Sequence, residues 1–168
     1  MASVAEVLLD GFERISEAVH EVLNGLTLED LTYRPDPQAN SISWLVWHLT
    51  RVQDDHVAGA TGLAQVWLDG WEQRAGLPFA ATEHGYGHDS SQVAQVRLSA
   101  DFLAGYYDAV HAQTVTFVSG LRDADLDAIV DRRWDPPVTL GVRLVSVLAD
   151  DLQHAGQAAY VRGLVERR

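Results

Sequence analysis

Hydrophobic residues recur at steps of three and four in four long stretches of this chain, as they do along one face of an α-helix. The four stretches are Val4–Gly25, Asn40–His56, Ser90–Gly120 and Thr139–Val165. Gly25 is suited to close the first helix, the Asn40–Ser43 segment to cap the second, and Thr139 to cap the last. The β-branched pair Ile129–Val130 is too short to predict a strand. The pattern therefore predicts an all-α protein built as a four-helix bundle.

The connections between these helices have their own signatures. They are a proline-containing connector (Leu26–Asn40), a short helix (Leu63–Arg74) with a following loop (Ala75–Asp89), and an acidic, broken segment (Leu121–Asp135). The loop before Asp89 carries several glycines together with His84 and His88. Because long loops in compact domains are often functional, we expect this one to form a mobile lid.

Length and composition indicate one folded domain over residues 1–168. Apolar residues make up 47% of the chain, which is enough for a sizeable core at this length. The first residues carry Glu6 and Asp10 where a signal peptide needs positive charge and a long apolar run. No uncharged stretch is long enough to cross a membrane. We therefore expect a cytoplasmic protein.

Charge narrows the set of partners. The chain has 24 acidic and 12 basic residues, a formal net charge of −12. Nucleic-acid affinity depends on basic residues that neutralise phosphates, and anionic membranes attract basic segments. The composition thus predicts a small-molecule partner, and neither nucleic acid nor membrane.

Two residue types that carry much enzyme chemistry are absent. The chain has no cysteine, and all twelve basic residues are arginine. Disulfides, thiolate metal sites, cysteine nucleophiles and Schiff-base lysines are therefore excluded. Any metal must be held by nitrogen and oxygen ligands.

Histidine and aspartate then become the candidate ligands, and helical geometry selects among them. His48 shares the apolar, inward face of its helix with Leu45 and Val52. A buried imidazole needs a partner for each nitrogen, so His48 is either a hydrogen-bonded core histidine or a metal ligand.

The last helix offers a second part of a metal site. Asp150 and His154 are four residues apart, so their side chains project from one face, about 40° from each other. Asp151 is the rival ligand or a partner that orients one. The alternative is a solvated polar stripe, since Leu144, Leu148 and Leu152 form a separate apolar face.

Together, His48, Asp150 and His154 give two imidazoles and one carboxylate. Catalytic zinc sites use such a three-ligand set with an open position, and nickel accepts the same donors. The set predicts a divalent metal centre, with zinc favoured and nickel as the alternative.

Further polar residues are candidates for contacts around this centre. His84 and His88 lie in the glycine-containing loop, and His56 lies two turns after His48. Arg143, two turns before Asp150 on the same stripe, is a candidate contact for an anionic substrate. Gln157, three residues after His154, is a candidate to orient a ligand or a thiol. The residues identify no catalytic acid or base beyond the ligands.

The motifs Ser41-Ile-Ser-Trp-Leu-Val-Trp-His48-Leu and Asp150-x-x-x-His154-Ala-Gly-Gln, with the proline-rich break before Thr139-Leu-Gly, resemble the DinB/YfiT-like superfamily. The resemblance is strongest to the actinobacterial branch that contains the N-terminal domain of mycothiol-dependent maleylpyruvate isomerase. It spans essentially the whole chain. It implies an up-down-down-up four-helix bundle, often a homodimer, with a divalent metal held at His48, Asp150 and His154.

The resemblance also implies a thiol chemistry. A metal-dependent enzyme of this kind would use a low-molecular-weight thiol, mycothiol, as an S-transferase or isomerase on a small electrophile. The isomerase has a second, C-terminal domain that contributes to catalysis, and the present sequence does not contain one. The alternatives are a non-enzymatic bundle dimer that binds a metal or a small molecule, and a plain bundle with an empty site.

Overall fold

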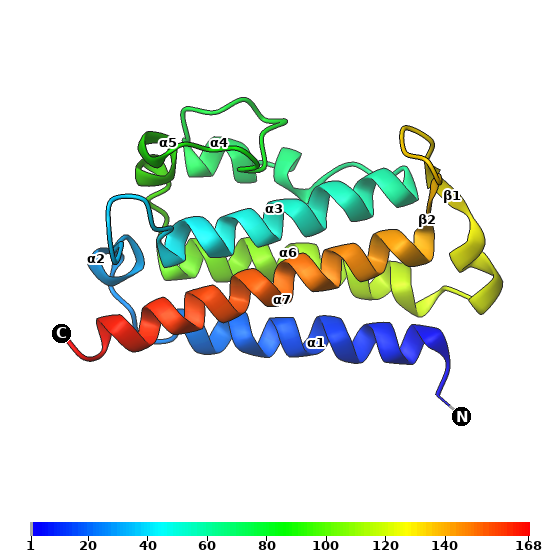
Figure 1. Ribbon diagram of the computed structural model, residues 1–168, viewed down its shortest axis with the longest axis horizontal. Coiled ribbons are helices and arrows are strands. Elements are labelled where there is room, and N and C mark those ends of the chain that lie inside the picture. The colour runs from blue at the N-terminus through cyan, green and yellow to red at the C-terminus, as the bar shows by residue number, and fades with distance from the viewer. Residues whose placement is uncertain (1) are drawn as a thin grey trace.

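Four long helices lie side by side along most of the length of the molecule (Figure 1). They are α1 (Val4–Leu23), α3 (Ile42–Thr61), α6 (Ala100–Ser119) and α7 (Leu140–Val165). The structure is a computed structural model that describes residues 2–168. Helices α1 and α3 each pack against both α6 and α7. The described chain is mostly helical, which confirms the predicted all-α class.

The ends of the long helices follow the capping residues of the sequence. The Ser41 side chain accepts a hydrogen bond from the Trp44 backbone, and Thr139 accepts one from Val142, so each caps the helix that follows it. Gly62 ends α3 with φ +74°, a left-handed conformation that glycine adopts without strain. The predicted caps at Ser41 and Thr139 are confirmed.

The predicted helix Ser90–Gly120 is wrong in one respect, because it is two helices. The structure has α5 (Ser90–Gln95) and then α6, with an extended segment between them. The Ser99 side chain caps α6 by accepting from the Phe102 backbone, and the Leu98 backbone donates to Ser43 Oγ of α3 at 2.9 Å. A serine that bonds locally competes with a continuous helix, and periodicity alone does not detect that competition.

Short helical turns fill the connections. They are α2 (Leu28–Leu31), the 3₁₀ turn η1 (Val66–Leu68), α4 (Trp71–Ala75) and the 3₁₀ turn η2 (Asp123–Asp127). The predicted short helix Leu63–Arg74 corresponds to η1 and α4. The two are separate because Gly70 between them has φ +78°.

A small hairpin corrects the expectation that the chain has no strand. Strand β1 (Ile129–Asp131) pairs antiparallel with β2 (Val138–Thr139), directly before α7. Each β-branched pair alone is too short to predict a strand. The prolines at 136 and 137 fall in the turn that brings the two pairs together, so the strands form only as partners of each other.

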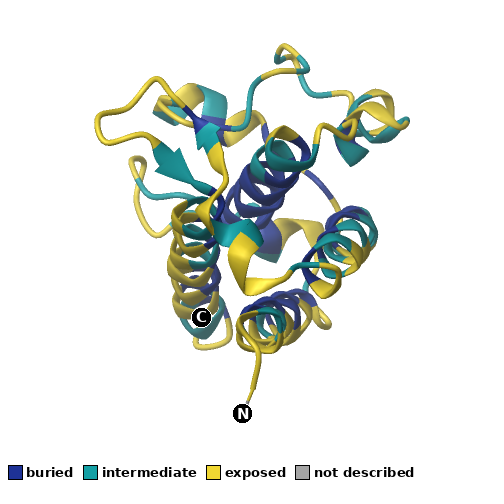
Figure 2. Cartoon of the chain, turned by 90° about the vertical axis from the view of Figure 1, so that its right-hand side faces the viewer, coloured by how far each residue is buried: buried dark blue, intermediate teal, exposed yellow. Residues whose placement is uncertain are grey.

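The core surrounds α3. Fifteen of the twenty residues of α3 are buried, whereas the other long helices bury mainly one side, as Figure 2 shows by colour. The largest fully buried side chains include Trp47, Tyr106, Tyr107, Phe12 and Leu45. Among residues 2–168, no helix combines the length and apolar character needed to cross a lipid bilayer.

Candidate metal centre

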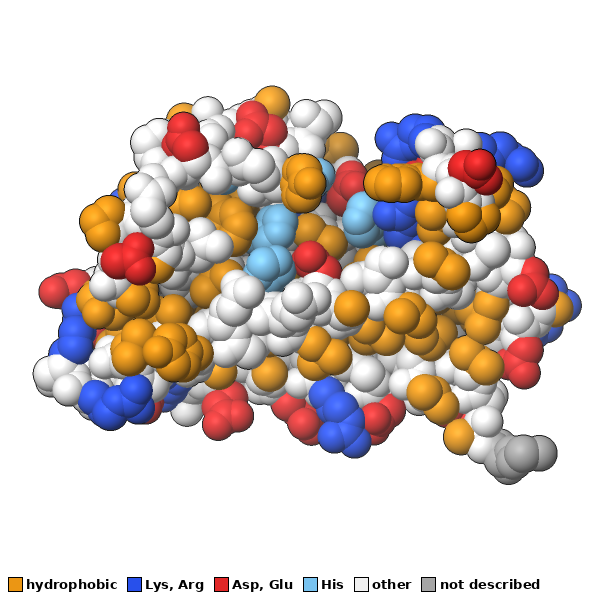
Figure 3. Space-filling view, viewed as in Figure 1, with side chains coloured by type: hydrophobic (Ala, Val, Ile, Leu, Met, Phe, Trp, Pro, Cys, Tyr) orange, Lys and Arg blue, Asp and Glu red, His pale blue; other side chains and the backbone are white. Residues whose placement is uncertain are grey.

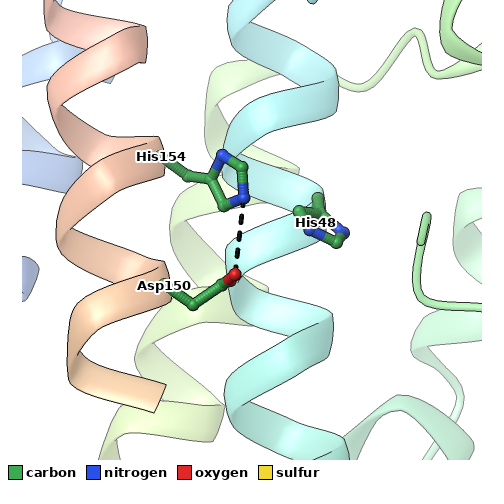
Figure 4. Close-up of side chains that lie close together, drawn as sticks. All are labelled: His48, Asp150 and His154. Carbon is green, nitrogen blue, oxygen red and sulfur yellow. Dashed lines mark ion pairs between the residues drawn. The ribbon is translucent and has the colours of Figure 1, made fainter. Parts of the chain in front are cut away.

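The three predicted ligands come together between α3 and α7. His48 projects from α3, and Asp150 and His154 project from adjacent turns of α7 toward it (Figure 4). One potential ligand atom from each residue lies within 4.8 Å of the other two. The His48 and His154 ring centroids are 4.7 Å apart, and His154 Nε2 lies 3.6 Å from Asp150 Oδ1. The packing of α3 on α7 therefore creates the cluster.

The surroundings of His48 determine which of its two ring nitrogens can bind a metal. Its Nδ1 is hydrogen-bonded to the backbone carbonyl of His84, and a carbonyl only accepts, so Nδ1 carries the proton. Burial lowers the pKa of His48 to about 4, so the ring is neutral near pH 7. The lone pair is then on Nε2. A metal ligand needs that state, with the other ring nitrogen donating to an oxygen.

His154 and Asp150 are oriented in a similar way. His154 Nδ1 lies 3.1 Å from the side-chain oxygen of Gln157, which leaves Nε2 on the side of Asp150. Burial lowers the pKa of His154, but its bonds to Asp150 and Gln157 outweigh burial and leave the pKa raised. Burial raises the pKa of Asp150, but the nearby imidazoles outweigh it, so the carboxylate stays ionised.

The donor set fits a divalent cation. Asp150 Oδ2 is shielded from solvent and has no hydrogen-bond partner among the described residues. An unpartnered carboxylate oxygen beside two imidazoles is costly unless a cation completes it. Nitrogen and oxygen donors suit zinc and nickel alike, so the cluster can hold a metal but does not identify it.

A wall over His48 comes from the loop before α5. Gly85 has φ +98°, and a Cβ there would lie 2.8 Å from His48 Nδ1 and 3.1 Å from both Trp44 Cζ2 and Trp47 Cζ3. Only a residue without a side chain allows the His84 carbonyl to approach His48 this closely. Trp44 stacks on the His48 ring, with centroids 4.6 Å apart.

A buried arginine fixes this loop to α3. Arg51 is fully buried and donates to the backbone carbonyls of Ala81 and Glu83, at 3.0 and 3.2 Å. Arg51 forms an ion pair with the fully buried Asp54, with Arg51 Nη1 and Asp54 Oδ2 3.6 Å apart. Together with the bond from His48, these contacts hold the loop against α3 as a wall of the site, and its movement as a lid stays a prediction.

The two histidines of this loop have different surroundings. His88 is nearly buried, and its ring accepts from Trp44 Nε1 at 3.2 Å and lies 3.2 Å from Glu83. It pins the loop and does not reach the metal cluster. The centroids of the His84 and His48 rings are 6.4 Å apart. His84 therefore contacts His48 through its backbone carbonyl, while its own imidazole lies beside the cluster.

Asp151, the rival ligand, points into the core instead. Its side chain is fully buried, and neither carboxyl oxygen has a partner among the described residues. Burial raises its pKa well above the ordinary value, and Asp150 next to it acts in the same direction. The structure thus does not bring Asp151 into the ligand set.

Arg143 and His56 meet farther along the groove. Arg143 Nη1 lies 3.4 Å from both ring nitrogens of His56, and Nη2 donates to Asp131 Oδ2 at 3.1 Å. Asp131 comes from β1 and was not predicted, because the hairpin that places it was not predicted either. Figure 3 shows histidine, acidic and arginine side chains together in the hollow between the loop and the hairpin.

Other residues that build the site also escaped the sequence analysis. Gly85 acts through its missing side chain and Arg51 through bonds to backbone carbonyls, which leave no residue-type signal. Arg51 and Asp54 do lie three residues apart on α3, but that spacing alone indicates an ordinary surface ion pair and not a fully buried one. Trp44 did leave one, because it lies four residues before His48 and therefore shares its helix face.

Comparison with known proteins shows the family of the chain and a solved structure with a similar fold. The family model described as mycothiol-S-transferase matches residues 7–167. A crystal structure of a conserved protein from Enterococcus faecalis superposes with a TM-score of 0.92 and 28% sequence identity, over 100% of both chains. No protein of curated function matches the chain. The match supports a DinB-like, mycothiol-related family, but not the narrower placement in the maleylpyruvate isomerase branch. The chain belongs to the mycothiol S-transferase family.

Proposed function

We propose that this protein is a metal-dependent transferase that joins the sulfur of mycothiol to a small electrophile. The observation that carries the proposal is the state of the two imidazoles. His48 and His154 each have Nδ1 engaged by an oxygen, so Nε2 is the ligand atom that each ring can offer. At His154 the metal would take the place of the proton that Asp150 favours. The family match over residues 7–167 supplies the thiol.

The metal and the residues around it would together make the thiol reactive. A divalent metal, when bound, lowers the pKa of a thiol so that thiolate is present near neutral pH. Two neutral imidazoles and one carboxylate leave that cation with net positive charge, which favours an anionic sulfur. Trp44 and the loop before α5 cover His48 and exclude water from one side. In the transfer the thiol releases its proton to solvent, sulfur bonds to the electrophilic carbon, and the bond from that carbon to the leaving group breaks so that the leaving group departs with the electron pair.

The test begins with metal analysis of protein purified without an affinity tag, followed by a mycothiol conjugation assay with monochlorobimane. We expect about one equivalent of zinc or nickel, and loss of both metal and conjugation in His48→Ala and His154→Ala. His20→Ala is the matched control, since His20 is a half-exposed histidine paired with Asp108. Full metal content in the two ligand variants would show that the site is misplaced.

The alternative is a non-enzymatic bundle that binds a metal or a small molecule. It predicts that chelation with EDTA lowers the melting temperature, while mycothiol with any electrophile gives no conjugate. An empty, purely structural cluster predicts an unchanged melting temperature with EDTA. Conjugation above the uncatalysed rate contradicts both.

The proposal also includes one domain over residues 1–168 and an up-down-down-up bundle. The chain directions in Figure 1 support that order, because α3 and α6 run from left to right and α1 and α7 from right to left. The reaction is proposed for the cytoplasm, where a reducing environment keeps small thiols reduced.

A homodimer with a small-molecule substrate completes the proposal. The exposed side of α7 carries Val142, Val145, Leu152 and Tyr160, which are 55%, 59%, 48% and 67% exposed. These residues are three, seven and eight positions apart, which places them on one side of the helix, as in a helix–helix seam. The net charge of −12 supports small molecules over nucleic acid or an anionic membrane as partners. Sedimentation of the wild type against Val145→Glu tests the dimer.

A further inference from the structure

A pocket lies on the hairpin side of the metal cluster, toward the start of α7. It has a volume of about 170 Å³ and is lined by the second half of α3, by β1 and by the start of α7. Arg143 in its wall precedes Asp150 by seven residues, which is about 10 Å along the helix. Ligand pockets for whole drug-sized molecules measure roughly 300–1,000 Å³, so this one suits a single ring-sized part of a larger ligand.

The charges in this pocket balance. Asp55 and Asp131 supply two negative charges, and Arg133 and Arg143 supply two positive ones. Arg143 and Asp131 are 17% and 6% exposed, and their side chains are 3.1 Å apart. His56 lies between Arg143 and Asp55, 3.5 Å from the Asp55 carboxylate. Hydrogen-bond donors and acceptors therefore alternate around the cavity.

This alternation selects one class of ligand. A simple anion would face the carboxylates of Asp55 and Asp131, and an apolar group would remove paired charges from water without replacing their hydrogen bonds. A hydroxyl group both donates and accepts, so neighbouring hydroxyls can donate to a carboxylate and accept from a guanidinium. Ala60 and Val130 in the wall offer apolar surface to the carbon face of a ring. These features fit a polyhydroxylated ring.

We propose that this pocket, the polyol pocket, binds one ring of the hydroxyl-rich part of the thiol while the sulfur of the thiol lies at the metal cluster. The inference rests on the proposed function, because it takes mycothiol as the thiol. Mycothiol carries a cysteinyl sulfur at one end and a glucosamine–inositol pair at the other. An extended cysteinyl–sugar arm can bridge the distance of about 10 Å between Asp150 and Arg143. The polyol pocket then distinguishes mycothiol from thiols without a sugar.

Gly59 gives a direct way to fill the pocket without touching its charges. It lines the pocket within α3, and a Cβ at this position would meet no atom within 4 Å. Gly59→Leu therefore places a side chain in open space and also replaces a poor helix former. Gly59→Ala is the matched control, because it makes the same helical change and occupies little of the cavity.

The experiment measures binding by calorimetry on metal-loaded protein, with mycothiol and with N-acetylcysteine as probes. We expect Gly59→Leu to weaken mycothiol binding about tenfold or more, as for one lost hydrogen bond to a charged group. N-acetylcysteine binding, metal content and Gly59→Ala should stay at wild-type values. Arg143→Gln should show the same selectivity for mycothiol.

The outcomes separate this inference from the proposed function. Equal loss for both thiols, or no loss for either, in Gly59→Leu overturns the polyol pocket. Failure of the wild type to bind mycothiol more tightly than N-acetylcysteine overturns it as well. Mycothiol binding that depends on Gly59, without conjugation of any electrophile, supports the pocket and contradicts the transferase.

Discussion

Arg51→Met tests how much the wall of the site depends on a buried charge. Arg51 is fully buried, and its guanidinium contacts the carbonyls of Ala81 and Glu83, the side chain of Gln65 and the carboxylate of Asp54. Methionine is uncharged and matches the aliphatic stem of arginine, but it ends where the guanidinium begins. The substitution therefore keeps the packing of the stem and removes every polar contact of the guanidinium at once.

The expected magnitude follows from what remains behind. Asp54 accepts from the backbones of Val66 and Trp67 and from the Tyr106 hydroxyl, each at 2.8 Å, but it loses the one cation that is paired with it within residues 2–168. Removing one member of a buried ion pair costs about 3–5 kcal/mol, because the other charge stays buried and uncompensated. For a chain of this length that corresponds to a melting temperature roughly 6–20 °C lower.

Urea unfolding followed by circular dichroism measures this loss, and chelator competition measures zinc affinity in the same samples. Zinc should bind more weakly, because the freed loop no longer holds the His84 carbonyl against His48. Arg14→Met is the control, since the Arg14–Asp10 pair is largely exposed and such pairs contribute little. Arg51→Lys keeps the charge and should lose less stability. A free energy of unfolding within about 1 kcal/mol of the wild type in Arg51→Met would refute the reasoning, because buried pairs are expected to cost more.

Three further predictions concern single positions. Gly85→Ala should reduce zinc affinity about 10–100-fold in chelator competition, because its Cβ would displace the carbonyl that orients His48. Gly87→Ala has a similar backbone strain (φ +80°) without a neighbour within 4 Å and should leave zinc affinity unchanged. Metal-free protein should lose stability as the pH falls from 6.5 toward 4, because the folded state lowers the pKa of His48 to about 4 and favours the neutral ring. Urea midpoints measured across this pH range should fall less in His48→Gln than in the wild type. Asp151→Asn should raise the urea midpoint at pH 7 but not at pH 3, because the folded state raises the pKa of Asp151 and disfavours its charged form; a stability gain of the same size at both values would contradict this.

The long helices were predictable from the sequence because their apolar spacing and their capping residues agree. Ser41 and Thr139 act as the caps that their positions indicate. The hairpin and the break at Ser99 were not predictable in the same way. Each depends on contacts with a distant segment, as when the Leu98 backbone bonds to Ser43 across 55 residues of sequence. Local pattern describes elements that are stable by themselves and misses elements that form only on packing.

The residues of the site likewise fall into those that local sequence pattern could identify and those that it could not. Asp150 and His154 could be paired because they lie one turn apart on a single helix. His48 could be added only by assuming that the inward faces of two helices meet. The His84 carbonyl and Gly85 could not be found, because a backbone oxygen and a missing side chain carry no residue-type signal. Periodicity thus found the donors, and the three-dimensional structure was needed to find what orients them.

The burial of α3 has a consequence for how this protein can acquire new substrates. A helix enclosed on nearly every side tolerates few substitutions, because almost any change of volume there disturbs the core. The turn of the β1–β2 hairpin, residues 132–137, is exposed and flanks the pocket, so it can change in length or sequence at smaller cost. The loop of residues 76–89 is less free, because Gly85 is buried and the carbonyls around it bond to Arg51 and His48. Libraries directed at the hairpin turn, with α3 kept constant, should therefore yield altered substrate selectivity more often than libraries directed at α3 and α7.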